Sequence, residues 1–188
     1  MALLRVWRAA RMGLLQCLCV LAMVGVGPAR ADPVGLDNFD LARTEDGLML
    51  NFSVQFSLSR AVEDALLKGV PLFFVAEADV FRDRWYWRDK KVNSVSRTWR
   101  LAYQPLTRKY RVTLGGLNQN YDSLSDAMAV VSRTVQWKLA DPPQLDDGHH
   151  YVEFRYQLDT TQMPRPMQIG INGQPEWSLR VERVRQLP

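Results

Sequence analysis

The sequence predicts a mainly β fold, an antiparallel β-sandwich-like domain of about seven strands with two helices; a β-rich α+β domain is the alternative. Several segments alternate apolar and polar residues with period two, which is typical of half-buried strands. Turn signals rich in Gly, Asp and Asn separate these segments. Only two segments show helical spacing, so helices are few.

The first half of the chain begins with two predicted strands and a helix. Residues 39–43 form a short strand, and "TEDG" turns the chain back. Residues 48–58 form the clearest strand, because all of its even positions are apolar: Leu48, Leu50, Phe52, Val54, Phe56 and Leu58. Ser59 then caps a helix over residues 60–68, which Gly69 ends.

Five more strands and one helix complete the predicted fold. The strands begin at residue 72 and cover 98–103, 109–114, 151–159 and 176–184. Ser123 and Asp126 resemble a capping box that starts a helix over residues 123–137. Its apolar face comprises Leu124, Met128, Val131 and Val135. Residues 163–173 contain two prolines and are expected to form a covering loop or an edge segment.

Residues 1–31 have the three parts of a secretory signal. Three arginines precede an uncharged run over residues 12–27, and Ala29 and Ala31 occupy the small-residue positions before a cleavage site. The uncharged run is 16 residues long, which is shorter than the roughly 18 to 20 residues that span a bilayer comfortably. We therefore predict a cleaved signal and a periplasmic location, with an uncleaved N-terminal anchor as the alternative.

Removal of the signal changes the composition of the chain. The full sequence has 24 Lys and Arg against 20 Asp and Glu, but four arginines lie in residues 1–31, so residues 32–188 have 20 of each. This neutral balance argues against a nucleic-acid partner. Cys17 and Cys19 also lie in the signal, so a hydrophobic core alone must stabilise the single domain predicted over residues 32–188.

Four long segments of the chain resemble a known family. They are "EDALLKGVPLFFVAEADVFRDRWYWRDK", "TWRLAYQPLTRKYRV", "LGGLNQNYDSL" and "YVEFRYQLDTTQMPRPMQIGI". These segments resemble the bacterial domain-of-unknown-function family 4390, exported proteins of Proteobacteria. The resemblance implies no activity, ligand or catalytic residue. It does imply genes that lie near a membrane sensor histidine kinase, and hence an envelope or sensor protein as a partner.

The segment "FRDRWYWRDKK", residues 81–91, combines aromatic and basic side chains. The even positions from Leu72 to Val80 are apolar, whereas beyond them the odd positions Phe81, Trp85 and Trp87 are aromatic. Because side chains alternate faces in a regular strand, this change of phase predicts a bulge within residues 80–83. The bulge would place the aromatic side chains in the core and the arginines in solvent.

The alternative interpretation of this segment is an anion-binding surface. Its candidate residues are Arg82, Arg84, Trp85, Trp87, Arg88, Arg97 and Trp99. Residues 82–111 contain ten Lys or Arg and only two Asp. In an exported protein the anions available are lipid headgroups, peptidoglycan and acidic partners. A solvated face neutralised by the acidic residues of 141–159 would explain the same charges.

Two other groups of residues are weaker candidates for chemistry. His149 and His150 follow two aspartates, but adjacent residues of a strand point to opposite faces, so no metal or cofactor is predicted. Glu77 and Asp79 share one face of a strand, roughly 6.6 Å apart at ~3.3 Å per residue. That spacing suits paired carboxylates of a glycosidase, and it equally suits cross-strand ion pairs with the arginines of residues 97–100.

These observations favour a non-enzymatic periplasmic binding or protein-interaction module linked to an envelope sensor. One alternative is a small periplasmic hydrolase or carbohydrate-active enzyme that uses Glu77 and Asp79. Another is a carrier that holds an apolar ligand between sheet and helix. Membrane contact is expected only where the signal remains attached, and the sequence favours no particular oligomeric state.

Export should remove residues 1–31. N-terminal sequencing of the protein recovered from the periplasm is then expected to begin at Asp32. An intact N-terminus in the membrane fraction would instead identify a retained anchor.

Overall fold

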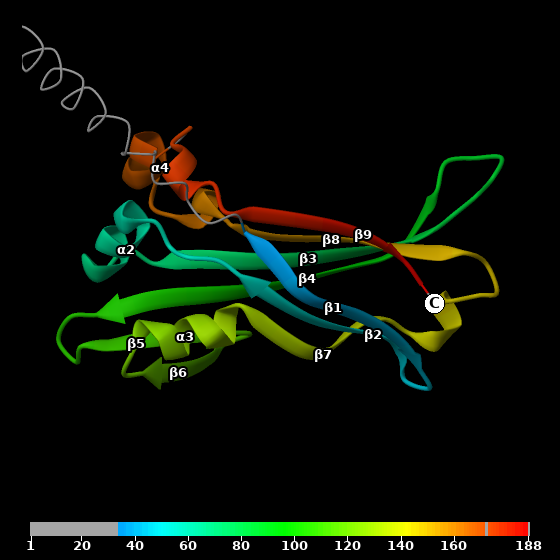
Figure 1. Cartoon of the computed structure of the whole chain (residues 1–188), viewed down its shortest axis with the longest axis horizontal. Coiled ribbons are helices and arrows are strands. Elements are labelled where there is room, and N and C mark those ends of the chain that lie inside the picture. The colour runs from blue at the N-terminus through cyan, green and yellow to red at the C-terminus, as the bar shows by residue number, and fades with distance from the viewer. Residues whose placement is uncertain (1–33, 172, 188) are drawn as a thin grey trace, which may run out of the picture. The chain divides into compact units, whose positions relative to one another are not determined.

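The structure, a computed structural model, describes residues 34–171 and 173–187, and their fold is mainly β (Figure 1). In this part of the chain nine strands form two antiparallel sheets, with short helices added in an α+β layout. The predicted fold class is confirmed. The predicted signal at residues 1–31 lies outside the described residues. Residues 32–188 make one compact unit by themselves.

The smaller sheet has the strand order β1-β2-β7, with β1 at Gly35–Thr44, β2 at Gly47–Gln55 and β7 at Arg133–Ala140. The alternation predicted for β2 is confirmed, because Leu48, Leu50, Phe52 and Val54 are all buried. Gly47 begins β2 with a φ of 121°, and a Cβ at this position would lie 2.1 Å from the carbonyl oxygen of Ala140. Only glycine fits that turn.

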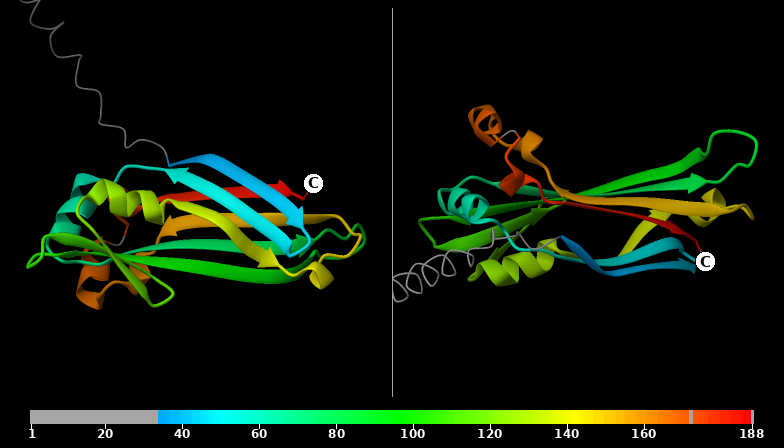
Figure 2. Two further views of the ribbon diagram at one scale, coloured as in Figure 1. Left: turned by 90° about the horizontal axis from the view of Figure 1, so that it is seen from below. Right: turned by 45° about the horizontal axis from the view of Figure 1, so that its top comes forward.

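The larger sheet has six strands in the order β6-β5-β4-β3-β8-β9. Their bounds are Leu72–Arg82 for β3, Lys90–Gln104 for β4, Lys109–Leu114 for β5, Leu117–Tyr121 for β6, His150–Leu158 for β8 and Arg180–Gln186 for β9. The two sheets lie face to face and enclose the core (Figure 2). Inward-facing side chains alternate along β3, and Phe74, Ala76, Ala78 and Val80 are fully buried there.

Aromatic rings fill the centre of the sandwich. The ring of Phe52 on the smaller sheet lies 4.8 Å from that of Phe154 and 6.1 Å from that of Tyr156, both on β8. It also meets Trp99 of β4 edge-on, with centroids 6.4 Å apart. The buried hydroxyl of Tyr156 donates a hydrogen bond of 2.9 Å to the carbonyl oxygen of Val131. Burial of this phenol therefore leaves no unpaired hydroxyl that would destabilise the fold.

The helices gather near the end of the sandwich opposite the β3–β4 turn (Figures 1 and 2). They are α2 at Arg60–Leu67, α3 at Leu124–Val131 and α4 at Arg165–Ile171. The predicted caps are confirmed: the side chain of Ser59 accepts from the amide of Val62, and that of Ser123 accepts from the amide of Asp126. The segment 163–173, predicted as a covering loop or edge segment, contains α4.

The prediction of one helix over residues 123–137 was wrong beyond Val131. Residues 133–140 form β7, which pairs with β2, and the side chain of Val135 is 58% exposed. The strand is irregular at Gln136, which has a φ of 51° and donates its amide hydrogen to the side chain of Asn51. This irregularity disturbs the period-two pattern, and it explains why β7 resembled a helix continuation. Because β6 and β7 were not predicted, the number of strands in the described residues is nine rather than about seven.

Two valines of the segment predicted as a helix provide a matched test. Val131, the last residue of α3, is fully buried, so Val131→Asp should bury an unpaired charge and lower the free energy of unfolding by about 3 kcal/mol or more. Val135→Asp should change it by less than about 1 kcal/mol, because this side chain faces solvent. Urea unfolding of both variants measures the difference; equal effects would contradict the assigned end of α3.

Candidate functional site

The turn between β3 and β4 exposes three consecutive aromatic side chains. Trp85 is 93% exposed, Tyr86 68% and Trp87 74%. We call residues 83–89 the aromatic tip. The prediction that Trp85 and Trp87 belong to the core was therefore wrong.

The register of β3 explains why these side chains are outside the core. The pairing of β3 with β8 runs without a break to Arg82, so Val80 faces inward and Phe81 outward. The expected irregularity does occur between Val80 and Phe81, but only against β4, where Val92 is the extra residue. Phe81 thus packs on the outer face, stacked on Tyr151 at 5.2 Å. The strand ends at Arg82, before the tryptophans.

Hydrogen bonds stabilise the aromatic tip, both between its own residues and with residues in and next to β8. The carboxylate of Asp89 accepts from the amide of Arg84 at 3.2 Å and from the hydroxyl of Tyr151 at 2.9 Å. Burial and this bond to Asp89 raise the pKa of Tyr151 to about 12, so the phenol remains a donor at neutral pH. The amide of Asp83 also donates to the carbonyl oxygen of His149 at 2.9 Å. The turn therefore has a defined shape.

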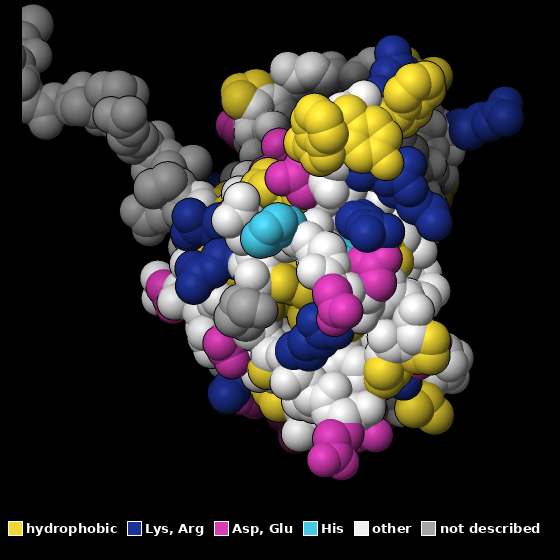
Figure 3. Space-filling view, turned by 90° about the vertical axis from the view of Figure 1, so that its right-hand side faces the viewer, with side chains coloured by type: hydrophobic (Ala, Val, Ile, Leu, Met, Phe, Trp, Pro, Cys, Tyr) yellow, Lys and Arg dark blue, Asp and Glu magenta, His cyan; other side chains and the backbone are white. Residues whose placement is uncertain are grey.

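Basic side chains flank the aromatic tip. Arg82 pairs with Asp146 at 2.5 Å and Lys91 pairs with Asp79 at 2.7 Å. Arg84, Arg88 and Lys90 make no ion pair with any described residue. Figure 3, which views the molecule from this end, shows hydrophobic side chains gathered beside several Lys and Arg. The tip therefore presents rings and available cations on one surface.

Two of the seven predicted binding residues lie elsewhere. Trp99 is only 1% exposed and belongs to the aromatic core, so its side chain is not part of any binding surface. Arg97 lies on the inward-facing side of β4, with its guanidinium 5.2 Å from the ring centroid of Trp137. Burial lowers the pKa of Arg97. Its stacking on Trp137 closes the edge of the core between the two sheets.

The two carboxylates considered for catalysis lie on the outer face of β3 and form ion pairs. Glu77 accepts from Arg155 at 3.1 Å, and Asp79 accepts from Lys91 at 2.7 Å and from Ser94 at 2.5 Å. Cross-strand pairing was expected, but its partners are Lys91 and Arg155 rather than the arginines of residues 97–100. Burial acts to raise the pKa of Asp79, yet the bonds from Lys91 and Ser94 outweigh it and leave that pKa lowered. A general acid requires the opposite shift.

The two histidines differ in burial: His150 is the first residue of β8, and His149 lies just before the strand. His150 is buried and its Nδ1 lies 2.7 Å from the carbonyl oxygen of Gly148, whereas His149 is exposed. Among residues 34–171 and 173–187, no three His, Cys, Asp or Glu side chains are grouped as metal ligands would be. Within those same residues, every helix is too short or too polar to cross a bilayer.

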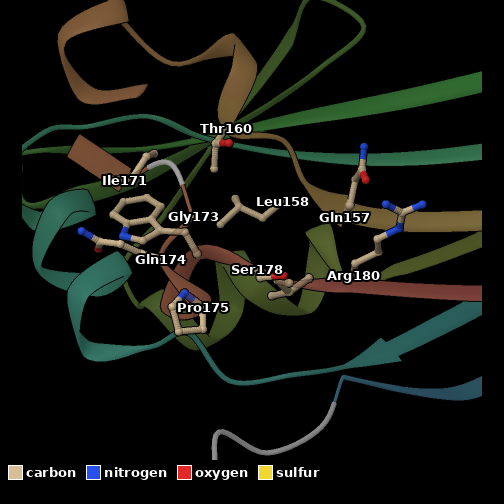
Figure 4. Close-up of a pocket in the computed structure, with 11 residues that line it drawn as sticks. Gln157, Leu158, Thr160, Ile171, Gly173, Gln174, Pro175, Ser178 and Arg180 are labelled. Carbon is tan, nitrogen blue, oxygen red and sulfur yellow. The ribbon is translucent and has the colours of Figure 1, made fainter. Parts of the chain in front are cut away.

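A cavity of about 450 Å³ lies beside α4, at the end of the sandwich opposite the β3–β4 turn (Figures 1 and 4). Its apolar wall is formed by Leu158, Ile171, Trp177 and Leu179. Polar side chains, including Gln157 and Arg180, occupy its mouth, and Arg180 is paired with Glu182. This open and half-polar hollow is the place where an apolar ligand carrier would hold its cargo, but it gives such a ligand little enclosure.

The sequence interpretation missed two residues of the aromatic tip, Tyr86 and Asp89, and also Tyr151 of β8, which supports the tip. One signal for the tip was available, because three aromatic residues in a row cannot all point to one face of a strand. At least one of Trp85, Tyr86 and Trp87 had to leave the core. The hydrogen bond between Asp89 and Tyr151 joins residues 62 positions apart, so no local sequence pattern predicts it.

Comparison with known proteins identifies a family. The model of the family described as "Domain of unknown function (DUF4390)" matches residues 31–186. No curated protein and no solved structure matches the chain.

Trp87 in the β3–β4 turn and Trp99 in β4 should respond differently to truncation. Trp99→Ala removes a fully buried ring and should cost about 3 to 5 kcal/mol of the free energy of unfolding. Trp87→Ala should cost less than about 1 kcal/mol, because its ring faces solvent. Urea unfolding monitored by circular dichroism compares the two variants. A large loss in the free energy of unfolding for Trp87→Ala would show that this ring is part of the core.

Proposed function

The chain belongs to the family described as Domain of unknown function (DUF4390), and we propose a role for it from its own residues. It is an exported, non-enzymatic binding module that contacts a partner in the cell envelope through the aromatic tip. The observation that carries this proposal is the exposure of Trp85, Tyr86 and Trp87 together. Trp, Tyr and Arg are the side chains that contribute most energy at binding surfaces.

The aromatic tip contributes little to the stability of the domain. The core contains rings from both sheets and is complete without residues 83–89. Exposed apolar area is unfavourable by roughly 25 cal/mol per Å², so three adjacent exposed rings are a cost to the isolated domain. Burial against a partner would recover that cost.

The other features of the chain support a binding role in the periplasm. The composition of residues 1–31 favours export. The carboxylates of Glu77 and Asp79 are held in ion pairs, which suits a structural role better than proton transfer. The bonds of Asp89 to Arg84 and Tyr151 keep the tip in one shape before any contact is made.

Site-specific photo-crosslinking in cells tests the proposal. A photoreactive residue at Tyr86 should give light-dependent adducts with envelope components, identified as protein or lipid by mass spectrometry. The matched control is Leu106, which is also solvent-facing but lies in the β4–β5 turn. Adducts that are absent at position 86, or equally abundant at position 106, would show that the aromatic tip is not the contact surface.

A further inference from the structure

We propose that the aromatic tip binds the surface of an anionic phospholipid membrane, with Trp85, Tyr86 and Trp87 inserted into its interfacial layer. This inference rests on the proposed function and names the partner of the same surface. It adds a route to the membrane that is independent of residues 1–31.

The three side chains have the chemistry that membrane interfaces select. Trp and Tyr combine a large apolar ring with one polar group, so they concentrate where hydrocarbon meets headgroups and water. In the described residues the other tryptophans, Trp99, Trp137 and Trp177, are buried. Within residues 34–171 and 173–187, both exposed tryptophans therefore lie in one three-residue segment.

The charges around the rings complement an anionic surface. Arg84, Arg88 and Lys90 have no acidic partner among the described residues. The carboxylate of Asp89 is already bonded to the amide of Arg84 and to Tyr151. The guanidinium groups are therefore available to lipid phosphates, which they bind through paired hydrogen bonds.

The shape of the molecule allows the rings to reach a flat surface. The β3–β4 turn lies at one end of the long axis, where the segment between β7 and β8 reaches about as far (Figures 1 and 2). An approach along that axis brings the turn that carries Trp85, Tyr86 and Trp87 to the membrane at the leading end of the molecule. A bilayer needs no complementary pocket for such a turn.

The size of the apolar surface favours lipid over a folded protein as the partner. Three aromatic side chains bury roughly 450 to 750 Å² at ~150 to 250 Å² each. A stable protein interface needs about 800 Å² from each partner, so the tip alone falls short of one. Insertion into lipid has no such threshold, because each ring that enters the interface contributes independently.

Vesicle binding tests the inference on residues 32–188, the compact unit that contains the whole described core. Vesicles of phosphatidylcholine with phosphatidylglycerol should sediment this protein, and vesicles of phosphatidylcholine alone should sediment much less. The double variant Trp85→Ala/Trp87→Ala should lose on the order of tenfold or more in apparent affinity. The control Leu106→Ala/Ile169→Ala removes two exposed apolar side chains elsewhere and should bind as the unchanged protein does.

Two further measurements locate the contact. Arg84→Gln/Arg88→Gln should reduce the preference for phosphatidylglycerol while circular dichroism shows an unchanged fold. Lipids brominated near the headgroup should quench the tryptophan emission of the unchanged protein, and this quenching should be lost in Trp85→Ala/Trp87→Ala.

Failure of this inference is distinct from failure of the proposed function. No sedimentation with phosphatidylglycerol vesicles, or equal sedimentation of the double tryptophan variant, would overturn the lipid partner. A protein adduct at position 86 together with that result would retain the aromatic tip as the binding surface and assign it a protein partner. Absence of any specific adduct at position 86 would overturn both.

Discussion

The packing of Phe52 between the two sheets is the contact on which the rest of the domain depends. Its ring touches Trp99, Phe154 and Tyr156 across the sandwich and Trp137 within its own sheet. Residues 32–188 contain no cysteine, so no disulfide joins the sheets. Apolar burial must therefore hold the sandwich together, and the smaller sheet supplies its share chiefly through alternate residues of β2.

Polar contacts then fix how α3 and the smaller sheet lie on the larger one. Tyr156 donates to the carbonyl oxygen of Val131, and Asn93 donates to that of Leu139 at 2.6 Å. Each bond would leave a poorly solvated polar group if the sheets slid by one residue. Val80, opposite Asn93, is the last fully buried residue of β3. The hairpin beyond it is released from core packing, and this release allows the aromatic tip to face solvent.

The sequence predicted the elements whose pattern is local, and it failed where distant contacts decide. The alternation of β2 and the caps at Ser59 and Ser123 were sufficient for correct assignments. β7 was missed because the bulge at Gln136 is stabilised by Asn51, which lies 85 residues away in the chain. For the candidate site, the residue types of the aromatic tip were identified correctly, but their exposure depends on where β3 ends, and the register with β8 sets that end.

The place of the aromatic residues in the hairpin also follows from strand geometry. Consecutive side chains of a strand point to opposite faces, so a strand could direct only Trp85 and Trp87, or only Tyr86, into the core between the two sheets. A turn can carry all three at once without disturbing the pairing of any strand. Because Asp89 and Tyr151 hold the backbone of the turn, its shape does not depend on the rings themselves. The core around Phe52 and the surface of the aromatic tip therefore use different residues. Substitutions in the tip can change what this surface binds while the packing of the core stays the same.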